Sequence, residues 1–232
     1  MTRAIDVLYE DNHLLVVHKP AGLLTQGDKT GDATALEAGK EYIRATANKP
    51  GNVFLGLVHR IDRPVSGVLV FARTSKAASR LAQSFHDRKV EKTYLAVVLG
   101  RLRKNEGELE GFVERTHLRS RLAAVESASA KRAALSYRVL AAHGELSLLE
   151  VIPHTGRHHQ IRLQLSAAGH PVAGDLKYRA PRALPDKSIA LHAARIAFPH
   201  PVREEIVSVT VPPPAREPWT HFHDAVSLYF ES

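Results

Sequence analysis

Short apolar runs bounded by turn residues are the feature that most restricts the fold of this chain. Residues 68–73 read VLVFAR, a run apolar almost throughout, which is typical of a strand buried on both faces. Turn residues at 11–12 (Asp-Asn) and at 143–145 (His-Gly-Glu) separate neighbouring runs and predict hairpins. The predicted strands are 5–9, 14–18, 53–58, 68–73, 92–99, 133–141, 146–152, 189–198 and 205–211.

Other segments have the period of a helix. In the segment TSKAASRLAQSFHDR, Ala78, Leu81 and Phe85 fall on one stripe, as in a helix that packs against a sheet. The proline run at 212–214 must end regular structure, because proline lacks the backbone N–H and clashes with a preceding turn. The predicted helices are 33–47, 74–88 and 158–168.

The chain shows no repeat, no low-complexity linker and no shift in composition. Its 232 residues are 44% hydrophobic and 24% charged, which is ordinary for a globular protein with an ample core. We therefore expect one α+β domain over 1–232, built on a single mixed, mainly antiparallel sheet with flanking helices.

Charge and cysteine content limit the classes of function that the chain can have. Lys and Arg number 32 against 24 Asp and Glu, so the net charge is +8, which favours a polyanionic partner such as nucleic acid or an acidic membrane. A merely basic protein without such a partner remains an alternative. The absence of cysteine excludes disulfides, thiolate zinc sites and cysteine nucleophiles. No apolar run is long enough for a signal peptide or a membrane span, so we expect a cytoplasmic protein without a membrane partner.

The stretch HRIDRPVSG, residues 59–67, holds a single carboxylate in a basic clamp. Asp62 stands between Arg60 and Arg63, in a loop between two predicted strands, where functional residues are often placed. Positive charge on both sides favours an ionised carboxylate, which can act as a nucleophile or a base. A surface ion pair in a tight turn is the alternative reading. Because no second carboxylate lies nearby, hydrolysis by a carboxylate pair is disfavoured.

The stretch HTGRHHQIR, residues 154–162, opens the predicted helix 158–168. His158 and Arg162 would lie one turn apart on it, and the first backbone N–H groups would suit an anion. Arg162 stands between Ile161 and Leu163, at the edge of the apolar stripe. A guanidinium buried there needs a carboxylate or phosphate partner. An arginine that reaches back to solvent is the alternative.

Basic residues also gather in RTHLRSR, residues 115–121. Arg115, Arg119 and Arg121 are predicted to follow RNA phosphates, although a solvated charged hairpin is an equally good reading. The sequence has 14 histidines but no HExxH or comparable ligand spacing, so we expect no metal. It has neither a phosphate-binding loop of the Walker type nor a GxGxxG stretch, so we expect no cofactor.

Several blocks of the sequence, taken in order, resemble the RluA-type RNA pseudouridine synthases. The resemblance runs from about residue 5 to 213, which we take as the catalytic core, and it implies the pseudouridine synthase fold without an N-terminal accessory RNA-binding domain. The family signature around Asp62 is matched with Ile61 and Val65 in place of leucine and threonine, and His158 replaces another threonine. The matching blocks are VLYEDNHLLVVHKPAGLLTQ, HRIDRPVSGVLVFAR, EKTYLAVVLG, HTGRHHQIRLQLSAAGHPVAGDLKY and ALHAARIAFPHP.

The resemblance implies that the chain isomerises uridine to pseudouridine in RNA. Asp62 matches the catalytic carboxylate, which serves as nucleophile or base. Arg162 matches the arginine that pairs with this carboxylate, and Tyr94 matches the tyrosine that stacks on the uracil. Leu191 takes an apolar pocket position, and Arg60 matches a residue that fills the gap left by the flipped nucleotide, since the reacting atoms cannot be reached in stacked RNA.

The RNA partner would be ribosomal or transfer RNA, bound by a monomer. Two other classes stay open: a non-catalytic RNA-binding module of the same fold, and a phosphate-handling hydrolase, for which we find no ligand set or nucleophile–base pair. The residues expected to contact substrate or RNA, besides the catalytic set, are Arg60, Arg63, Leu191, His158, Arg157, Arg115, Arg119 and Arg121.

Overall fold

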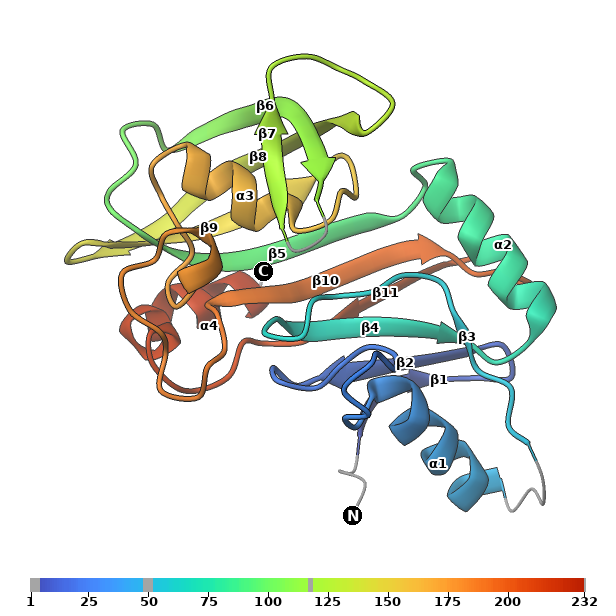
Figure 1. Ribbon diagram of the computed structural model, residues 1–232. Coiled ribbons are helices and arrows are strands. Elements are labelled where there is room, and N and C mark those ends of the chain that lie inside the picture. The colour runs from blue at the N-terminus through green and yellow to red at the C-terminus, as the bar shows by residue number, and fades with distance from the viewer. Residues whose placement is uncertain (1–4, 48–51, 117–118, 232) are drawn as a thin grey trace. The chain divides into compact units, whose positions relative to one another are not determined.

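The computed structural model describes residues 5–47, 52–116 and 119–231, which belong to two compact units. Unit 1 comprises Met1–Lys92 and Ala193–Val211, and unit 2 comprises Thr93–His192 and Pro212–Ser232. The chain therefore leaves one unit for the other after Lys92, His192 and Val211 (Figure 1).

A mixed sheet with two helices forms unit 1. Its strands are β1 (Asp6–Glu10), β2 (Leu14–Lys19), β3 (Gly56–Leu57), β4 (Ser66–Ala72), β10 (Leu191–Pro199) and β11 (Ile206–Thr210), and its helices are α1 (Ala35–Ala47) and α2 (Ser75–His86). The first two residues of β10, Leu191 and His192, still belong to unit 2. The strand order is β1-β2-β4-β10, with β3 added to β4 and β11 to β10. Strand β2 is antiparallel to β1 and to β4, and β10 is antiparallel to β11. The arrows of β4 and β10, which are hydrogen-bonded neighbours, point the same way in Figure 1, so the sheet is mixed.

The sheet of unit 1 is buried on both faces. Leu14 and Val16 of β2 belong to one core cluster with Leu81 of α2. Leu15 faces the other way, because a Cβ placed on Gly39 of α1 would lie 3.3 Å from the Leu15 side chain. Helices α1 and α2 therefore cover opposite faces, which explains why β2 and β4 are apolar at successive positions. Burying each such side chain contributes roughly 1.5–3 kcal/mol.

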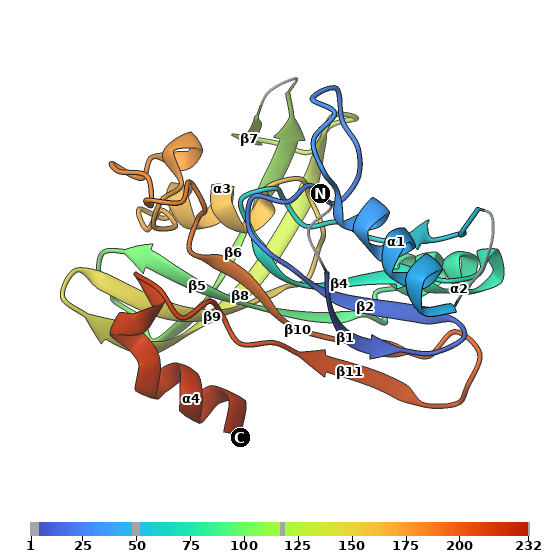
Figure 2. The same cartoon turned by 90° about the horizontal axis from the view of Figure 1, so that it is seen from below.

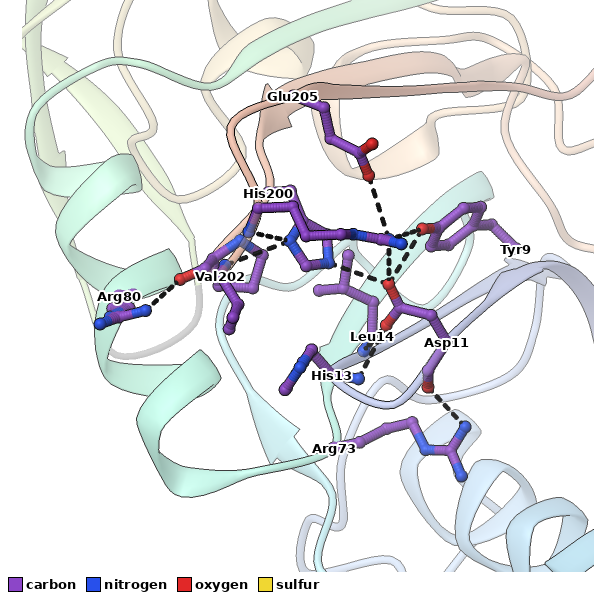
Figure 3. Close-up of polar contacts among 11 residues, drawn as sticks. Tyr9, Asp11, His13, Leu14, Arg73, Arg80, His200, Val202 and Glu205 are labelled. Atoms are coloured by element: carbon purple, nitrogen blue, oxygen red, sulfur yellow. Dashed lines mark hydrogen bonds and ion pairs between the residues drawn. The ribbon is translucent and has the colours of Figure 1, made fainter.

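A polar network ties the β1–β2 turn to the β10–β11 turn within unit 1 (Figure 3). Asp11 Oδ1 accepts a hydrogen bond of 2.7 Å from the backbone N–H of His13, and Asp11 Oδ2 lies 2.9 Å from His200 Nε2. The other ring nitrogen of His200 accepts from the backbone N–H groups of Val202 and Arg203, at 3.1 and 2.8 Å. Since Nδ1 accepts, the His200 proton lies on Nε2 and is donated to Asp11.

An antiparallel sheet forms unit 2, in the order β5-β9-β8-β6-β7. Helices α3 and α4 lie on opposite sides of β5 and β9 in both Figure 1 and Figure 2. The 14-residue strand β8 is the longest, and it pairs with both β6 and β9. The elements are β5 (Glu91–Leu99), β6 (Glu106–Arg115), β7 (Ser120–Ala123), β8 (Ala130–His143), β9 (Leu146–Pro153), α3 (Gln160–Ala167), the 3-10 turns η1 (Leu176–Tyr178) and η2 (Trp219–Phe222), and α4 (His223–Glu231).

The predicted α+β class with a mainly antiparallel sheet is confirmed. The predicted hairpin turn at 143–145 is also confirmed, since β8 ends at His143, Gly144 has a φ of 56°, and β9 begins at Leu146. The predicted strand 53–58 is wrong in extent, because only Gly56–Leu57 pairs with β4 and the side chain of Phe54 is 51% exposed. Strands β6 and β7 and helix α4 were not predicted. The single domain over 1–232 stays a prediction.

Candidate active site

The loop that carries Asp62 is fixed at both ends of the HRIDRPVSG stretch. The buried side chain of Thr25 donates a 2.8 Å hydrogen bond to the Ile61 carbonyl, and the backbone N–H of Val65 donates to the Asp62 carbonyl. At the exit, Gly67 has a φ of 127°, and a Cβ there would collide with the backbone of Ala193. Glycine is needed at this position, because β4 and β10 approach each other closely where the loop ends.

Lys19 is the basic side chain buried next to Asp62, and no role was predicted for it from the sequence. It is the last residue of β2 and is fully buried. Its Nζ donates to the carbonyls of Pro20 and Leu23, at 3.0 and 2.8 Å. Burial lowers the pKa of Lys19 to about 7, although the negative charge of Asp62 opposes this shift. A lysine at the end of an otherwise buried strand was the available signal, since buried lysine is rare without partners.

The two arginines beside Asp62 differ in what holds them. Arg63 Nε donates to the Gly22 carbonyl at 3.1 Å, and Arg63 Nη1 forms an ion pair of 2.8 Å with Asp32, in which both side chains are about half exposed. The backbone carbonyl of Arg63 accepts from the N–H of Gly22 at 2.7 Å. Arg63 thus joins the Asp62 loop to the loop that follows β2, and Arg60 is exposed.

The side chain of His59, three residues before Asp62, is hydrogen-bonded to the backbone of β4. Its Nε2 accepts a hydrogen bond of 2.9 Å from the N–H of Val70, and its ring stacks on Phe85 at a centroid distance of 5.0 Å. Burial, with a smaller contribution from Lys92, lowers the pKa of His59 to about 3. A neutral His59 is what this arrangement requires, because a protonated ring could not accept from Val70.

In unit 2, Arg162 is buried and held by a carboxylate of the same unit. Arg162 Nε lies 2.6 Å from Asp175 Oδ2 and Nη2 lies 2.9 Å from Asp175 Oδ1, which is the two-pronged geometry of a strong pair. The guanidinium carbon lies 5.1 Å from the centroid of the Tyr178 ring. The expectation that a buried Arg162 needs a carboxylate is confirmed. Asp175 and Tyr178 were not predicted, although both stand in the GDLKY stretch of the same sequence block.

Tyr178 connects Arg162 to the histidines before α3. Its hydroxyl lies 2.8 Å from His159 Nδ1 and accepts a 3.0 Å hydrogen bond from the backbone N–H of Ser120. Burial raises the pKa of Tyr178, so the phenol stays protonated at neutral pH. Ser120 Oγ in turn lies 2.9 Å from His158 Nδ1 and 2.7 Å from the His158 carbonyl oxygen.

The predicted helix start at His158 is wrong. Helix α3 begins at Gln160, and His159, its N-cap, has a φ of 55°, which no helical residue adopts. The rings of His158 and His159 therefore stack, with centroids 3.7 Å apart, instead of pointing in different directions. It follows that His158 does not lie one helical turn before Arg162. The N-cap residue makes no side-chain capping hydrogen bond, and Gln160 Oε1 accepts from the Arg157 N–H at 3.0 Å, which ties the first helical residue to the loop before it.

The remaining predicted residues lie on strands and turns of unit 2. Tyr94 lies on β5 opposite Val151 of β9, and Leu191 is buried at the start of β10. Arg121 of β7 pairs with Glu114 of β6 at 2.7 Å. The predicted phosphate-binding residues therefore lie on a charged hairpin. Arg115 ends β6, Arg119 and Arg157 are exposed, and His117 and Leu118 lie outside the described residues.

Neither a metal cluster nor a membrane-spanning helix occurs in the part of the chain that the structure describes. Within 5–47, 52–116 and 119–231, no group of His, Asp and Glu is arranged so that it could hold a metal ion. Over the same residues, every helix is too short or too polar to cross a bilayer.

Comparison with known proteins gives consistent matches. Residues 13–167 match the family described as RNA pseudouridylate synthase. Over 218 residues the chain is 34% identical to the uncharacterized RNA pseudouridine synthase YhcT of Bacillus subtilis, covering 91% of this chain and 69% of that protein. Over 224 residues it is 37% identical to the ribosomal large subunit pseudouridine synthase D of Xylella fastidiosa, covering 90% and 66%. The chain thus spans about two thirds of the length of these relatives.

Solved structures agree on the fold. The human RNA pseudouridylate synthase domain containing 4 protein superposes with a TM-score of 0.78 at 23% identity, covering 96% of this chain and 93% of that one. The human RNA pseudouridylate synthase domain containing 1 protein gives a TM-score of 0.71 at 25% identity, covering 91% and 84%.

Proposed function

Because the chain belongs to the RNA pseudouridylate synthase family, we propose that Asp62 is the carboxylate with which it isomerises uridine to pseudouridine in RNA. In this reaction the N1–C1′ bond breaks, a C5–C1′ bond forms, the C5 proton leaves and N1 gains a proton. Nothing is hydrolysed, so one ionised carboxylate, acting as nucleophile or base toward the ribose–uracil unit, is sufficient.

The observation that carries this proposal is the construction of the Asp62 loop. Asp62 lies in a loop whose backbone is fixed by Thr25 and Arg63, and the buried side chain of Lys19, whose pKa is lowered to about 7, lies next to it. A group that attacks or abstracts a proton must be held in one place, because small errors in position cost large factors in rate. Several of the fixing groups are buried within unit 1, which favours a built site over a surface ion pair.

Unit 2 supplies the other proposed catalytic groups. Tyr94 is proposed to stack on the uracil and to assist removal of the C5 proton, and Arg162 to keep Asp62 ionised and aimed. Leu191 would contribute an apolar wall. The pair with Asp175 supports this role for Arg162, because a guanidinium fixed by two hydrogen bonds points in one direction. Under this proposal the two units act together as one catalytic domain.

The substrate is proposed to be structured ribosomal or transfer RNA, and the name of the Xylella fastidiosa relative favours the large ribosomal subunit. Arg60 would fill the gap left by the flipped uridine, and its contacts there would offset part of the free energy needed to unstack the base. The other proposed RNA contacts are Arg63, Arg115, Arg119, Arg121, Arg157 and His158. We further propose a monomer that works in the cytoplasm without a metal or cofactor.

The substitution Asp62→Asn tests the assignment. The amide keeps the shape of the side chain but removes its charge, so pseudouridine formation should fall to background while folding and RNA affinity persist. Single-turnover conversion of a uridine-containing stem-loop, read as pseudouridine by mass spectrometry after nuclease digestion and derivatisation, measures the loss. Asp28→Asn is the matched control in unit 1, because Asp28 is exposed and, among the described residues, its carboxylate accepts hydrogen bonds only from Thr30. Turnover by Asp62→Asn close to that of the control would remove Asp62 from the mechanism.

A further inference from the structure

Unit 2 contains a cavity that none of the proposed catalytic residues line. It has a volume of about 530 Å³ and is formed by the turn after β5, the strands β6 and β8, and the end of α3. The turn contributes Arg101, Arg103 and Lys104, and the other walls include Leu109 and Tyr137.

The positive charge at this cavity is not neutralised. Arg103 and Lys104 are exposed, and among the described residues no carboxylate forms an ion pair with them or with Arg101. Arg101 Nε donates to the Gly144 carbonyl at 2.9 Å, which anchors its guanidinium beside the cavity. The cavity lining contains no acidic residue. Unpaired cations around a concave surface attract an anionic ligand.

The walls of the cavity are apolar and aromatic. Leu109 comes from β6, and the buried Leu165 comes from α3. The half-buried ring of Tyr137 is held over Gly107, its partner across the β6–β8 pair, since a Cβ on Gly107 would lie 2.8 Å from the Tyr137 hydroxyl. A held tyrosine ring next to free cations is the combination on which unpaired nucleotides stack.

A second cavity, which shares Tyr137, has the opposite charge character. It is about 350 Å³ in volume and is lined by Glu106, Glu108 and Glu150, together with Arg138. Arg138 is already paired with Glu150 at 3.1 Å. A phosphate in this second cavity would therefore be repelled, whereas the basic cavity attracts it.

We propose that the basic cavity binds one unpaired nucleotide of the RNA, with its base against Tyr137 and a flanking phosphate at Arg103 and Lys104. The proposal rests on the proposed function for the identity of the partner, RNA, but not on any catalytic residue. Such a site would hold a strand outside the reacting uridine, so it adds RNA affinity and leaves the chemical step unchanged.

An RNA strand without uridine cannot be converted, so its binding measures this cavity separately from the proposed reaction. The probe is a fluorescein-labelled oligoadenylate, whose anisotropy is titrated with the wild-type protein and with each variant over a salt series. Arg103→Ala combined with Lys104→Ala should weaken binding and lower the slope of log affinity against log salt by about 0.7, since the site holds one phosphate and each single-strand phosphate contact contributes about 0.7. Arg182→Ala, at another exposed arginine of unit 2, is the control for lost charge and should change the slope by no more than half as much.

Tyrosine variants test the stacking. Tyr137→Leu should weaken oligoadenylate binding about ten-fold, whereas Tyr137→Phe should bind like the wild type. Thermal melting of each variant shows whether the fold is retained. If Tyr137→Leu unfolds, the comparison of the Arg103/Lys104 variant with Arg182→Ala is then the test of whether the cavity binds RNA. Adenosine monophosphate serves as competitor and should displace the strand only at millimolar concentration.

Each result has a defined meaning. If the Arg103/Lys104 variant loses no more affinity than Arg182→Ala, or if a folded Tyr137→Leu binds like the wild type, the cavity does not bind RNA. Displacement by micromolar adenosine monophosphate would make it a site for free nucleotides and overturn the proposal as well. Single-turnover conversion of the stem-loop at saturating enzyme should be unchanged in the Arg103/Lys104 variant. If the wild type lacks turnover but binds oligoadenylate as described, the proposed function fails and the cavity assignment stands.

Discussion

At the scale of single residues, burying the ammonium group of Lys19 beside Asp62 costs free energy of folding, because the buried charge loses its hydration. This ammonium is fully buried and donates to backbone carbonyls, and burial lowers its pKa from 10.5 to about 7. The unfolded chain therefore binds more protons than the folded chain between pH 7 and 10.5. The contribution of Lys19 to stability therefore rises with pH across this window, because the folded state is relieved of a buried charge.

The variant Lys19→Met makes this cost measurable. Methionine has no titrating amine, so the stability of the variant should lack the rise with pH that Lys19 confers on the wild type. The free energy of unfolding lost on substitution should be larger at pH 9 than at pH 7, by about 2 kcal/mol. Urea denaturation at the two pH values gives the difference, with Lys29→Met, at an exposed lysine of unit 1, as control. A loss that is the same at both pH values would mean that Lys19 is not deprotonated in the folded protein.

At the scale of elements, the Asp11 network decides how two turns of unit 1 hold together. Besides its bonds to His13 and His200, the Asp11 carboxylate accepts from Tyr9 at 3.0 Å and from Arg203 at 2.5 Å. Burial raises the pKa of Asp11, but hydrogen bonds from the backbone of His13 and Leu14 and from the side chains of His200 and Tyr9 outweigh it and lower the pKa to about 2. A carboxylate with a lowered pKa stabilises the fold above its unfolded pKa, near 3.8, and this contribution is lost as pH falls through about 2.

Replacing Asp11 by Asn should remove this contribution. The amide cannot accept from all of these donors, so unfolding at pH 7 should become easier by about 2 kcal/mol. The deficit relative to the wild type should shrink as the pH is lowered from 4 toward 2, because the wild type then loses the same charge. Denaturant melts at several pH values provide the measurement, and Asp28→Asn at an exposed site should show little change. An unchanged deficit at pH 2 would show that the network acts through shape and not through charge.

The elements also show which parts of the fold are readable from sequence. Apolar runs such as 68–73 and the helix with Leu81 were predicted, because burial of one or both faces fixes their period. Strand β6 was not, since EGELEGFVER contains glutamates and glycines that disfavour strands, and pairing with β7 and β8 overrides this preference. The start of α3 was misplaced because a left-handed residue such as His159 leaves no mark in the hydrophobic pattern.

The candidate site likewise contains residues that the sequence reveals and residues that it does not. Asp62 and the arginines around it were found from charge in a short loop. Lys19 and Asp175 act through contacts between segments distant in sequence, as the 13-residue separation of Arg162 and Asp175 illustrates, and spacing alone does not reveal such contacts.

At the scale of the whole molecule, the proposed catalytic set is distributed over two units of one chain. Asp62 belongs to unit 1, and Tyr94 and Arg162 belong to unit 2. If the protein is a monomer, as we propose, both units that serve one uridine come from the same chain. A swapped dimer, in which each site draws its units from different chains, is the arrangement to test against, since exchange of equal parts is an easy route to dimers.

Mixing two inactive variants separates these arrangements. Asp62→Asn and Arg162→Met each remove one proposed catalytic group, and each should be inactive alone. In a monomer every chain of the mixture still lacks one group, so conversion of the stem-loop should stay at background even after joint unfolding and refolding, which allows chains to exchange partners. In a swapped dimer, refolding would instead pair an intact unit 1 with an intact unit 2 in about half of the dimers, since chains associate at random. Refolded wild-type protein is the control for recovery, and sedimentation at the assay concentration gives the mass. Activity that appears only in the refolded mixture would overturn the monomer while strengthening the assignment of both residues, because it can arise only if Asp62 and Arg162 are both required at one site.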